Sequence, residues 1–188
     1  ISITIFFTLY KFKLNIHYCF LYAVLISIIA YPSAGTPYVD HHASILSIIS
    51  LLFFILAIKT NTKSYWFFLP IILFLSFLTK QAPTSYIGLI IIFLSAFYFI
   101  FNFNIKKILY GLFGSFVSII IFLIILSFTK VSFASFYEQY ISFPMDIGKI
   151  RVDNFLFPLE FSRIFLRFKL IHIPLLILIF ISIKKIIK

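Results

Sequence analysis

The residues whose types best suit chemistry lie in two short polar stretches between long apolar runs. In the first stretch, YPSAGTPYVDHH, Asp40 comes directly before His41 and His42. A carboxylate in such a place can activate a hydroxyl group as a general base, or it can simply cap the helix expected to begin at His41. Two neighbouring histidines point about 100° apart on a helix and do not converge on one metal ion. Each histidine therefore fits a place beside a site or at a polar interface.

The second polar stretch, FLTKQAP, offers a cation in a turn expected from Lys80 to Thr84. Lys80 is the only basic residue in this turn. Its ammonium group can bind a phosphate or a sugar, and Gln81 adds hydrogen-bond donors. The alternative is that Lys80 only ends a helix, because a positive charge at a helix C-terminus is favourable. The two legs of the hairpin before it are of similar length, so Lys80 and Asp40 are expected at the same end.

A longer polar segment near the C-terminal end carries aromatic residues at helical spacing. Apolar positions recur at intervals of three and four in Phe133–Tyr140 and in Phe161–Phe168, which is typical of amphipathic helices that lie along a membrane surface. Pro144 is expected to interrupt the first pattern. Arg163 and Arg167 lie one turn apart in the second segment. They can attract anionic lipid headgroups or hold a phosphate as a pair of guanidinium groups.

The elements that position these residues are those of a membrane protein. The chain of 188 residues is 63% hydrophobic and only 11% charged, with a mean hydropathy of +1.15, whereas soluble domains are about half apolar and a quarter charged. The lipid bilayer is therefore the first expected partner. The net charge of +11 does not indicate nucleic acid, because the basic residues punctuate the apolar runs instead of gathering on one face. The single cysteine, Cys19, excludes a disulfide framework and a cysteine-based metal site.

Seven apolar runs predict an all-α polytopic membrane protein with six to seven transmembrane helices. Several runs are shorter than the roughly 20 residues that span a bilayer without tilt. No repeat or linker divides the chain, so residues 1–188 are expected to form one membrane domain. The first run begins at Ile1, already apolar, which predicts that an N-terminal part of the protein is missing. The runs are Ile1–Tyr10, Ile16–Ala30, Ala43–Ile58, Ser64–Thr79, Ser85–Phe101, Ile108–Phe128 and Leu170–Ile183.

The charges predict which ends of the helices face the cytoplasm. Lysines gather in every second gap between the runs, and short cytoplasmic loops accumulate lysine and arginine. The alternate gaps hold all five acids of the chain and are expected to lie outside. We therefore expect a multi-pass protein of the inner (plasma) membrane, with its site and its amphipathic segments on the outer, periplasmic face. The acids are Asp40, Glu138, Asp146, Asp153 and Glu160.

The two polar stretches together resemble the GT-C membrane glycosyltransferases of the mannosyltransferase and aminoarabinose-transferase type and their bacterial relatives. The matching pieces are PYVDHH at residues 37–42 and FLTKQAP at residues 77–83. In the first a polar outer loop ends in a V-D step into a helix, and in the second a hairpin returns at L-T-K. The resemblance covers residues 31–110. Gln81 departs from it, because relatives often have glycine there, and the family's acid in the first outer loop would lie upstream of Ile1.

The resemblance implies transfer of a sugar from a polyprenyl-phosphate donor to a glycan or lipid acceptor at the outer membrane face. Asp40 would be the catalytic residue, and Lys80 would stabilise the leaving phosphate. A divalent metal ion is a cofactor that such a site can use. The substrate-binding candidates are Lys80, Gln81, His41, His42, Arg163 and Arg167.

Two other functions remain open from the residues. A transporter or flippase component would also place charged residues along a substrate path, but no charged residue falls in the middle of a predicted helix. A non-catalytic scaffold subunit would need no site. It would be favoured if the upstream part of the protein had no acid in its first outer loop.

Overall fold

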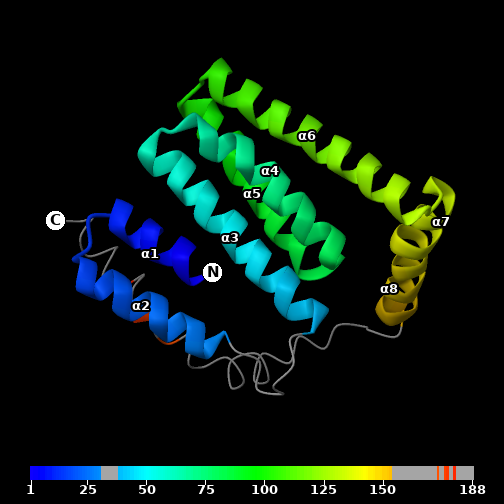
Figure 1. Cartoon of the computed structure of the whole chain (residues 1–188), viewed down its shortest axis with the longest axis horizontal. Coiled ribbons are helices and arrows are strands. Elements are labelled where there is room, and N and C mark those ends of the chain that lie inside the picture. Colours follow the sequence, from blue (N-terminus) through cyan, green and yellow to red (C-terminus); the bar gives the residue numbers. More distant parts are fainter. Residues whose placement is uncertain (31–37, 154–172, 174–175, 178–179, 181–188) are drawn as a thin grey trace. The chain divides into compact units, whose positions relative to one another are not determined.

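The structure is all-helical throughout the residues that it describes. This computed structural model describes residues 1–30, 38–153, 173, 176–177 and 180, and these contain helices and no strand. Six helices coincide with the first six predicted apolar runs (Figure 1). The predicted all-α class is therefore confirmed. The six helices are α1 (Ser2–Lys11), α2 (Ile16–Ile29), α3 (Val39–Thr60), α4 (Lys63–Thr79), α5 (Gln81–Phe101) and α6 (Ile105–Thr129).

Asparagine residues at the ends of the apolar runs set several of the helix limits. The side chain of Asn15 accepts a hydrogen bond from the backbone N–H of His17 and so caps α2. Asn104 caps α6 in the same way through the N–H of Lys107. Asn61 ends α3 with a positive φ of 57°, a conformation that asparagine adopts more readily than most residues. These caps keep the connections between consecutive helices short.

Within the residues that the structure describes, three helices are long and apolar enough to cross a membrane. They are α3, α5 and α6, with 22, 21 and 25 residues, and a helix rises about 1.5 Å per residue across a hydrocarbon core about 30 Å thick. The helices α2 and α4 are also apolar but shorter, with 14 and 17 residues. These lengths and compositions suggest a membrane location. The larger number of crossings expected from the sequence stays a prediction.

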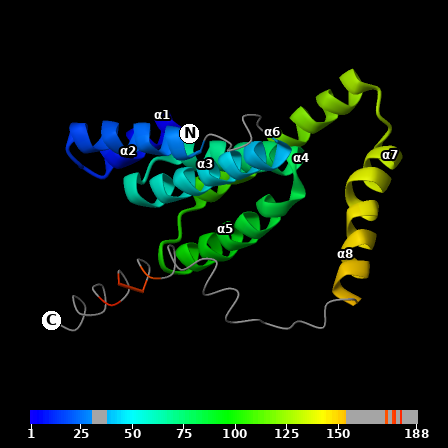
Figure 2. The ribbon, with the colours of Figure 1, turned by 90° about the horizontal axis from the view of Figure 1, so that it is seen from below.

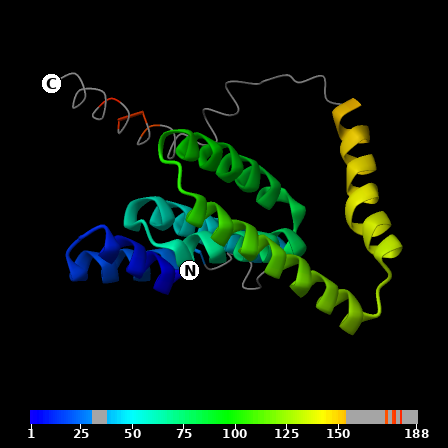
Figure 3. The ribbon, with the colours of Figure 1, turned by 90° about the horizontal axis from the view of Figure 1, so that it is seen from above.

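Within residues 1–130, α4 is the central helix. It packs against α3 on one side and α6 on the other, and α3 also contacts α5 (Figure 1). Figure 2 shows α5 on a different level from α3 and α4, and Figure 3 shows the short connection that leads from α5 into α6. The helices α1 and α2 form a hairpin beside α3. The antiparallel pair α3 and α4 therefore brings the first residues of α3 to the last residues of α4.

A buried apolar cluster lies near the end of the bundle where α3 connects to α4. Trp66 is at its centre, because the Trp66 ring centroid lies 4.8 Å from that of Phe99 and 6.1 Å from that of Phe54. Leu69 and Ile91 belong to the same buried core. Many other large apolar side chains are exposed, as expected where lipid instead of protein covers a helix. The exposed apolar surface agrees with a membrane location.

Small residues let α6 approach α4 closely. A Cβ atom built on Gly114 would overlap the carbonyl oxygen of Phe67 and would lie 2.8 Å from Cγ of Pro70. Gly114 and Ser118 are both buried. Pro70 lies inside α4 and has no N–H, so it leaves the carbonyl of Trp66 without its helical donor. Small residues at such positions are typical of helix pairs in membranes.

The chain divides into two compact units, and the second begins at Val131. The aromatic pattern is expected to be interrupted at Pro144, and the described part of this unit continues as helix through the proline. The N–H of Phe143 bonds to the carbonyl of Glu138 in a π-helical turn, which changes the hydrogen-bond register just before proline removes a donor. The segments are α7 (Phe133–Tyr137), the π-helical turn (Glu138–Ser142) and α8 (Phe143–Asp153).

The first amphipathic segment keeps part of its aromatic stripe within this helical unit. The rings of Phe136 and Tyr140 stack with their centroids 4.9 Å apart. Burial raises the pKa of the Tyr140 phenol to about 12, so this hydroxyl stays protonated at physiological pH. Its expected place along the outer membrane surface stays a prediction.

Two expectations for the C-terminal part fall on residues that the structure does not describe. The second amphipathic segment, Phe161–Phe168, lies outside the described residues, and so do Arg163 and Arg167 within it. Most of the predicted run Leu170–Ile183 lies outside them as well. The roles predicted for both arginines stay predictions.

Candidate functional site

Asp40 and Lys80 form an ion pair at one end of the α3–α4 hairpin. The ammonium nitrogen Nζ of Lys80 contacts the carboxylate oxygen Oδ1 of Asp40, and the two side chains are 47% and 60% exposed, respectively. This contact confirms their expected placement at the same end of the hairpin. An exposed ion pair contributes only about 0–1 kcal/mol to stability. Both charges therefore remain open to a ligand that competes for them.

Asp40 owes its position to the first turn of α3. The helix begins at Val39 instead of His41, with Tyr38 as its N-cap and no side-chain hydrogen bond at that cap. The interpretation of Asp40 as an N-cap is therefore wrong. Its carboxylate lies instead in the first turn, where the positive end of the helix dipole favours a negative charge.

Lys80 lies at the junction of two helices. Lys80 follows the last residue of α4, Thr79, and has an extended backbone of φ −160° and ψ 137°. Although α5 is bounded by Gln81 and Phe101, Ala82 also has a non-helical backbone, with φ −94° and ψ 131°, so the connection extends from Lys80 through Ala82. The N–H of Lys80 donates to the carbonyl of Ser76 at 3.1 Å. The predicted turn from Lys80 to Thr84 is therefore confirmed for its first residues but is shorter than expected, because Thr84 already belongs to α5 and is only 1% exposed.

Three buried hydroxyl groups lie deeper in the bundle than the ion pair. The Ser76 hydroxyl donates to the carbonyl of Ala43 at 2.9 Å and shares hydrogen bonds with Thr84 at 2.7 Å and Ser47 at 2.9 Å. The three hydroxyl residues are at most 2% exposed. They come from α3, α4 and α5, so they tie these helices together. Sequence reasoning missed this cluster, although Ser76 and Thr84 lie four residues before and after Lys80.

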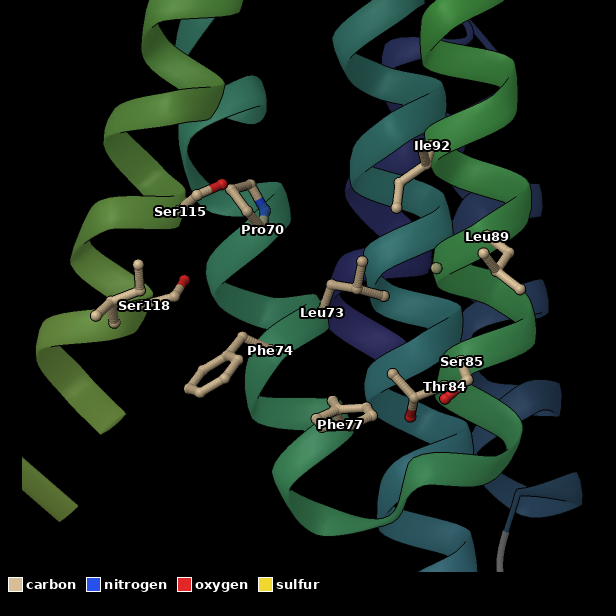
Figure 4. Close-up of a pocket in the computed structure, with 12 residues that line it drawn as sticks. Pro70, Leu73, Phe74, Phe77, Thr84, Ser85, Leu89, Ile92, Ser115 and Ser118 are labelled. Carbon is tan, nitrogen blue, oxygen red and sulfur yellow. The ribbon is translucent and has the colours of Figure 1, made fainter. Parts of the chain in front are cut away.

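An apolar groove runs beside this hydroxyl cluster, between α4, α5 and α6. Its volume is about 600 Å³, within the range of about 300–1,000 Å³ that small-molecule sites occupy. Phe74 and Phe77 on α4 and Ser118 on α6 are among its lining residues (Figure 4). Thr84 belongs both to the groove wall and to the hydroxyl cluster. The groove therefore includes residues three and four positions from Lys80 along the chain, Phe77 and Thr84.

The other polar residues at this end of the hairpin flank the ion pair along the chain. His42 is exposed, whereas Nδ1 of His41 is buried without a hydrogen-bond partner and its ring centroid lies 6.3 Å from that of Tyr38. Gln81 is the first residue of α5 and follows Lys80 directly. The described residues contain no group of three His, Cys, Asp or Glu side chains that could hold a metal ion. The divalent metal ion stays a prediction, and the chemistry is derived from side chains alone.

Fold and site together define a class of protein. The described residues form an all-helical protein with three helices that could span a membrane, an exposed Asp–Lys ion pair and an apolar groove lined in part by Phe77 and Thr84. Comparison of the chain with known protein families, with curated proteins and with solved structures finds no match. The resemblance to GT-C glycosyltransferases therefore rests on the two polar stretches alone.

Removing the central hydroxyl of the cluster is expected to destabilise the bundle modestly. In the Ser76→Ala variant, the Ala43 carbonyl on α3 loses the hydrogen bond from the Ser76 hydroxyl, and Ser47 and Thr84 lose a shared partner but keep their own hydrogen bond at 3.2 Å. Because interhelical hydrogen bonds in membranes contribute about 0.6 kcal/mol on average, we expect a loss of about 1 kcal/mol in the free energy of unfolding. Unfolding in mixed micelles with increasing dodecyl sulfate would measure it. Ser85→Ala is the control, since its exposed hydroxyl bonds within its own helix, and equal losses for both variants would contradict the prediction.

Proposed function

We propose that the chain is part of a membrane glycosyltransferase that moves a sugar from a polyprenyl phosphate to a glycan or lipid acceptor. The observation that carries this proposal is the position of Lys80, which contacts the Asp40 carboxylate and lies three residues after Phe77 and four before Thr84, both of which line the apolar groove. A polyprenyl phosphate has the complementary form, because a long apolar chain ends in a phosphate. The groove suits the chain, and the ammonium group suits the phosphate.

The transfer reaction needs one base and one cation, and the ion pair supplies both. The acceptor hydroxyl attacks the anomeric carbon of the sugar, and the bond between this carbon and the phosphate oxygen breaks. The phosphate leaves with the bonding electron pair, and the Lys80 ammonium stabilises its added negative charge. The proton of the acceptor hydroxyl passes to the Asp40 carboxylate, which acts as a general base.

The ion pair must open before this reaction, and opening it costs little. Lys80 exchanges the Asp40 carboxylate for the phosphate, which accepts a charge-assisted hydrogen bond in its place. The exposed pair contributes only about 0–1 kcal/mol, so the phosphate can displace the carboxylate readily. Asp40 is then free to accept a proton.

The lysines at the other end of the helices support the expected orientation. Lys59 and Lys63 flank the connection from α3 to α4, and Lys106 follows the connection from α5 to α6. Short loops that carry lysine tend to face the cytoplasm. With this orientation, the Asp40–Lys80 pair lies at the outer, periplasmic face of the inner membrane, where lipid-linked sugars and their acceptors meet.

The residues that follow the ion pair along the chain are the candidates for sugar recognition. Gln81 comes directly after Lys80, and His41 and His42 come directly after Asp40. Amide and imidazole groups both donate and accept hydrogen bonds, as sugar hydroxyls require. We assign them substrate binding for this reason.

Removal of the Lys80 charge is expected to weaken binding of a polyprenyl phosphate at least tenfold. A hydrogen bond to a charged group contributes about 1.5–3 kcal/mol, and about 1.4 kcal/mol corresponds to a factor of ten in affinity. The Lys80→Gln variant would be titrated in detergent with a short-chain polyprenyl phosphate and with the matching polyprenol, which lacks the phosphate. We expect the variant to lose affinity for the first ligand only.

Lys63→Gln is the matched control for this titration, because it removes an exposed lysine at the opposite end of α4. It is expected to bind both ligands as the wild-type protein does. If Lys80→Gln and Lys63→Gln bound the phosphate equally well, Lys80 would not hold the donor and the proposed function would lose its main support.

A further inference from the structure

Lys107 is a buried charge at the end of the bundle away from the Asp40–Lys80 pair. It lies in the first turn of α6 and is only 4% exposed. Its ammonium nitrogen donates a hydrogen bond to the Tyr98 hydroxyl at 2.7 Å and lies 5.0 Å from the centroid of the Tyr98 ring. An ammonium group has three donors, so these contacts satisfy only part of its hydrogen-bonding capacity.

No carboxylate of the described residues neutralises Lys107. The ion pairs in that part of the chain are the Asp40–Lys80 pair at the other end of the bundle and one pair within α8. Removing an unpaired ammonium group from water is costly, so an anion bound from outside the chain would stabilise this site. The neighbouring residue, Lys106, is exposed and is not among the residues that line the cavity beside Lys107.

A second donor lines the same cavity. Trp66 is 4% exposed, and its indole nitrogen Nε1 is buried with no hydrogen-bond partner. Trp66 and Lys107 both line a cavity of about 270 Å³ between α4, α5 and α6, and Tyr98 links them, with its ring centroid 5.7 Å from that of Trp66. Indole and ammonium groups donate hydrogen bonds and accept none. The partner that suits this cavity is therefore an acceptor with negative charge.

We propose that this cavity binds the phosphate group of an anionic phospholipid, with the Lys107 ammonium and the Trp66 N–H as donors. Most other lining residues, such as Leu69 and Leu112, are apolar, which suits an acyl chain better than a fully hydrated free anion. Basic pockets between membrane helices on the cytoplasmic side commonly hold anionic headgroups. This site lies apart from the Asp40–Lys80 pair and does not depend on the proposed transferase activity.

Trp66 is the only tryptophan of the chain, so its fluorescence reports directly on this cavity. The chain would be reconstituted in phosphatidylcholine vesicles that contain increasing fractions of brominated phosphatidylglycerol or brominated phosphatidylcholine. Bromine on an acyl chain quenches tryptophan on contact. We expect the anionic lipid to reach half-maximal quenching at about one fifth of the mole fraction that phosphatidylcholine needs, the preference that one lysine near a headgroup confers.

Three variants identify the group that recognises the phosphate. Lys107→Gln is expected to abolish the fivefold preference, and Lys107→Arg is expected to keep it because the positive charge remains. Lys106→Gln is the matched control, since it removes the same charge from an exposed neighbour. It should leave the preference unchanged. Equal losses in Lys106→Gln and Lys107→Gln would show general surface attraction and would overturn the assignment of the cavity.

Inorganic phosphate separates a lipid headgroup from a free anion. Millimolar phosphate at constant ionic strength is expected to leave the lipid preference unchanged, because the membrane holds the headgroup at a high local concentration. If phosphate removed the preference, the cavity would bind the free anion and the lipid proposal would be wrong. Equal quenching by the two brominated lipids in the wild-type protein would also refute the proposal, and this comparison needs no variant.

Discussion

The Asp40→Asn variant is expected to transfer sugar at about one hundredth of the wild-type rate or less, although it folds normally. Asparagine keeps the size of the side chain and can accept a hydrogen bond from Lys80, but it cannot take a proton from an acceptor hydroxyl. General-base catalysis contributes about 10²–10⁴ in rate. Loss of an exposed ion pair costs only about 0–1 kcal/mol in stability. Rate and stability therefore respond to this change on very different scales.

The rate would be measured with full-length protein in membranes, using labelled hexose and pentose polyprenyl phosphates and glycolipid acceptors from the cell envelope. Asp146→Asn is the matched control, because it removes the same charge from another exposed ion pair, in which Asp146 lies 3.2 Å from Lys149. It should transfer sugar at the wild-type rate. Near-normal transfer by a well-folded Asp40→Asn variant would exclude Asp40 as the catalytic base.

The same measurement distinguishes the transferase from its rivals. A transporter or flippase component would move the lipid-linked sugar between leaflets without forming a glycosidic bond. A scaffold subunit would form no product and move no lipid. Product that requires both Asp40 and Lys80 favours the transferase, whereas lipid movement that requires them, without product in the wild-type protein, favours the transporter.

The positions of the helices were predictable because an apolar run of helical length has few alternatives in a membrane protein. The helix starts were less predictable. Both α3 and α5 begin several residues before the corresponding apolar runs, because Asp40 and Thr84 are polar and yet belong to the first turns of these helices. Hydropathy marks the apolar part of a helix, whereas hydrogen bonding and dipole interactions decide where its polar turns begin.

The ion pair was predictable, but its surroundings were not. Two antiparallel legs of similar length must bring Asp40 and Lys80 to one end, whichever faces of the helices meet. The hydroxyl cluster around Ser76 and the cavity of Trp66 and Lys107 depend on which faces meet. Helices that are apolar all round carry no stripe that marks the buried face. The packing faces are therefore set by close contacts between helices, above all the approach of α6 to α4.

Adding one methyl group where α6 approaches α4 is expected to destabilise the bundle by about 2–3 kcal/mol. This value lies near the upper end of the cost of overpacking. In the Gly114→Ala variant, the new Cβ would overlap the carbonyl oxygen of Phe67 and lie 2.8 Å from Cγ of Pro70. A backbone carbonyl cannot move without its helix, and a proline ring is stiff. The strain is therefore relieved only if α4 and α6 separate.

Two other glycines of the chain provide controls for the Gly114→Ala measurement, which would follow unfolding in mixed micelles by Trp66 fluorescence. A Cβ on Gly148 meets no heavy atom within 4 Å, and one on Gly88 meets only the Leu73 side chain, at 3.5 Å. Gly148→Ala should be neutral or stabilising, because alanine favours a helix over glycine by about 1 kcal/mol, and Gly88→Ala should cost little.

A Gly114→Ala variant as stable as the wild-type protein would mean that α6 does not approach α4 so closely. Since α6 forms one wall of the groove, the separated helices should also bind polyprenyl phosphate more weakly, and Gly148→Ala should not.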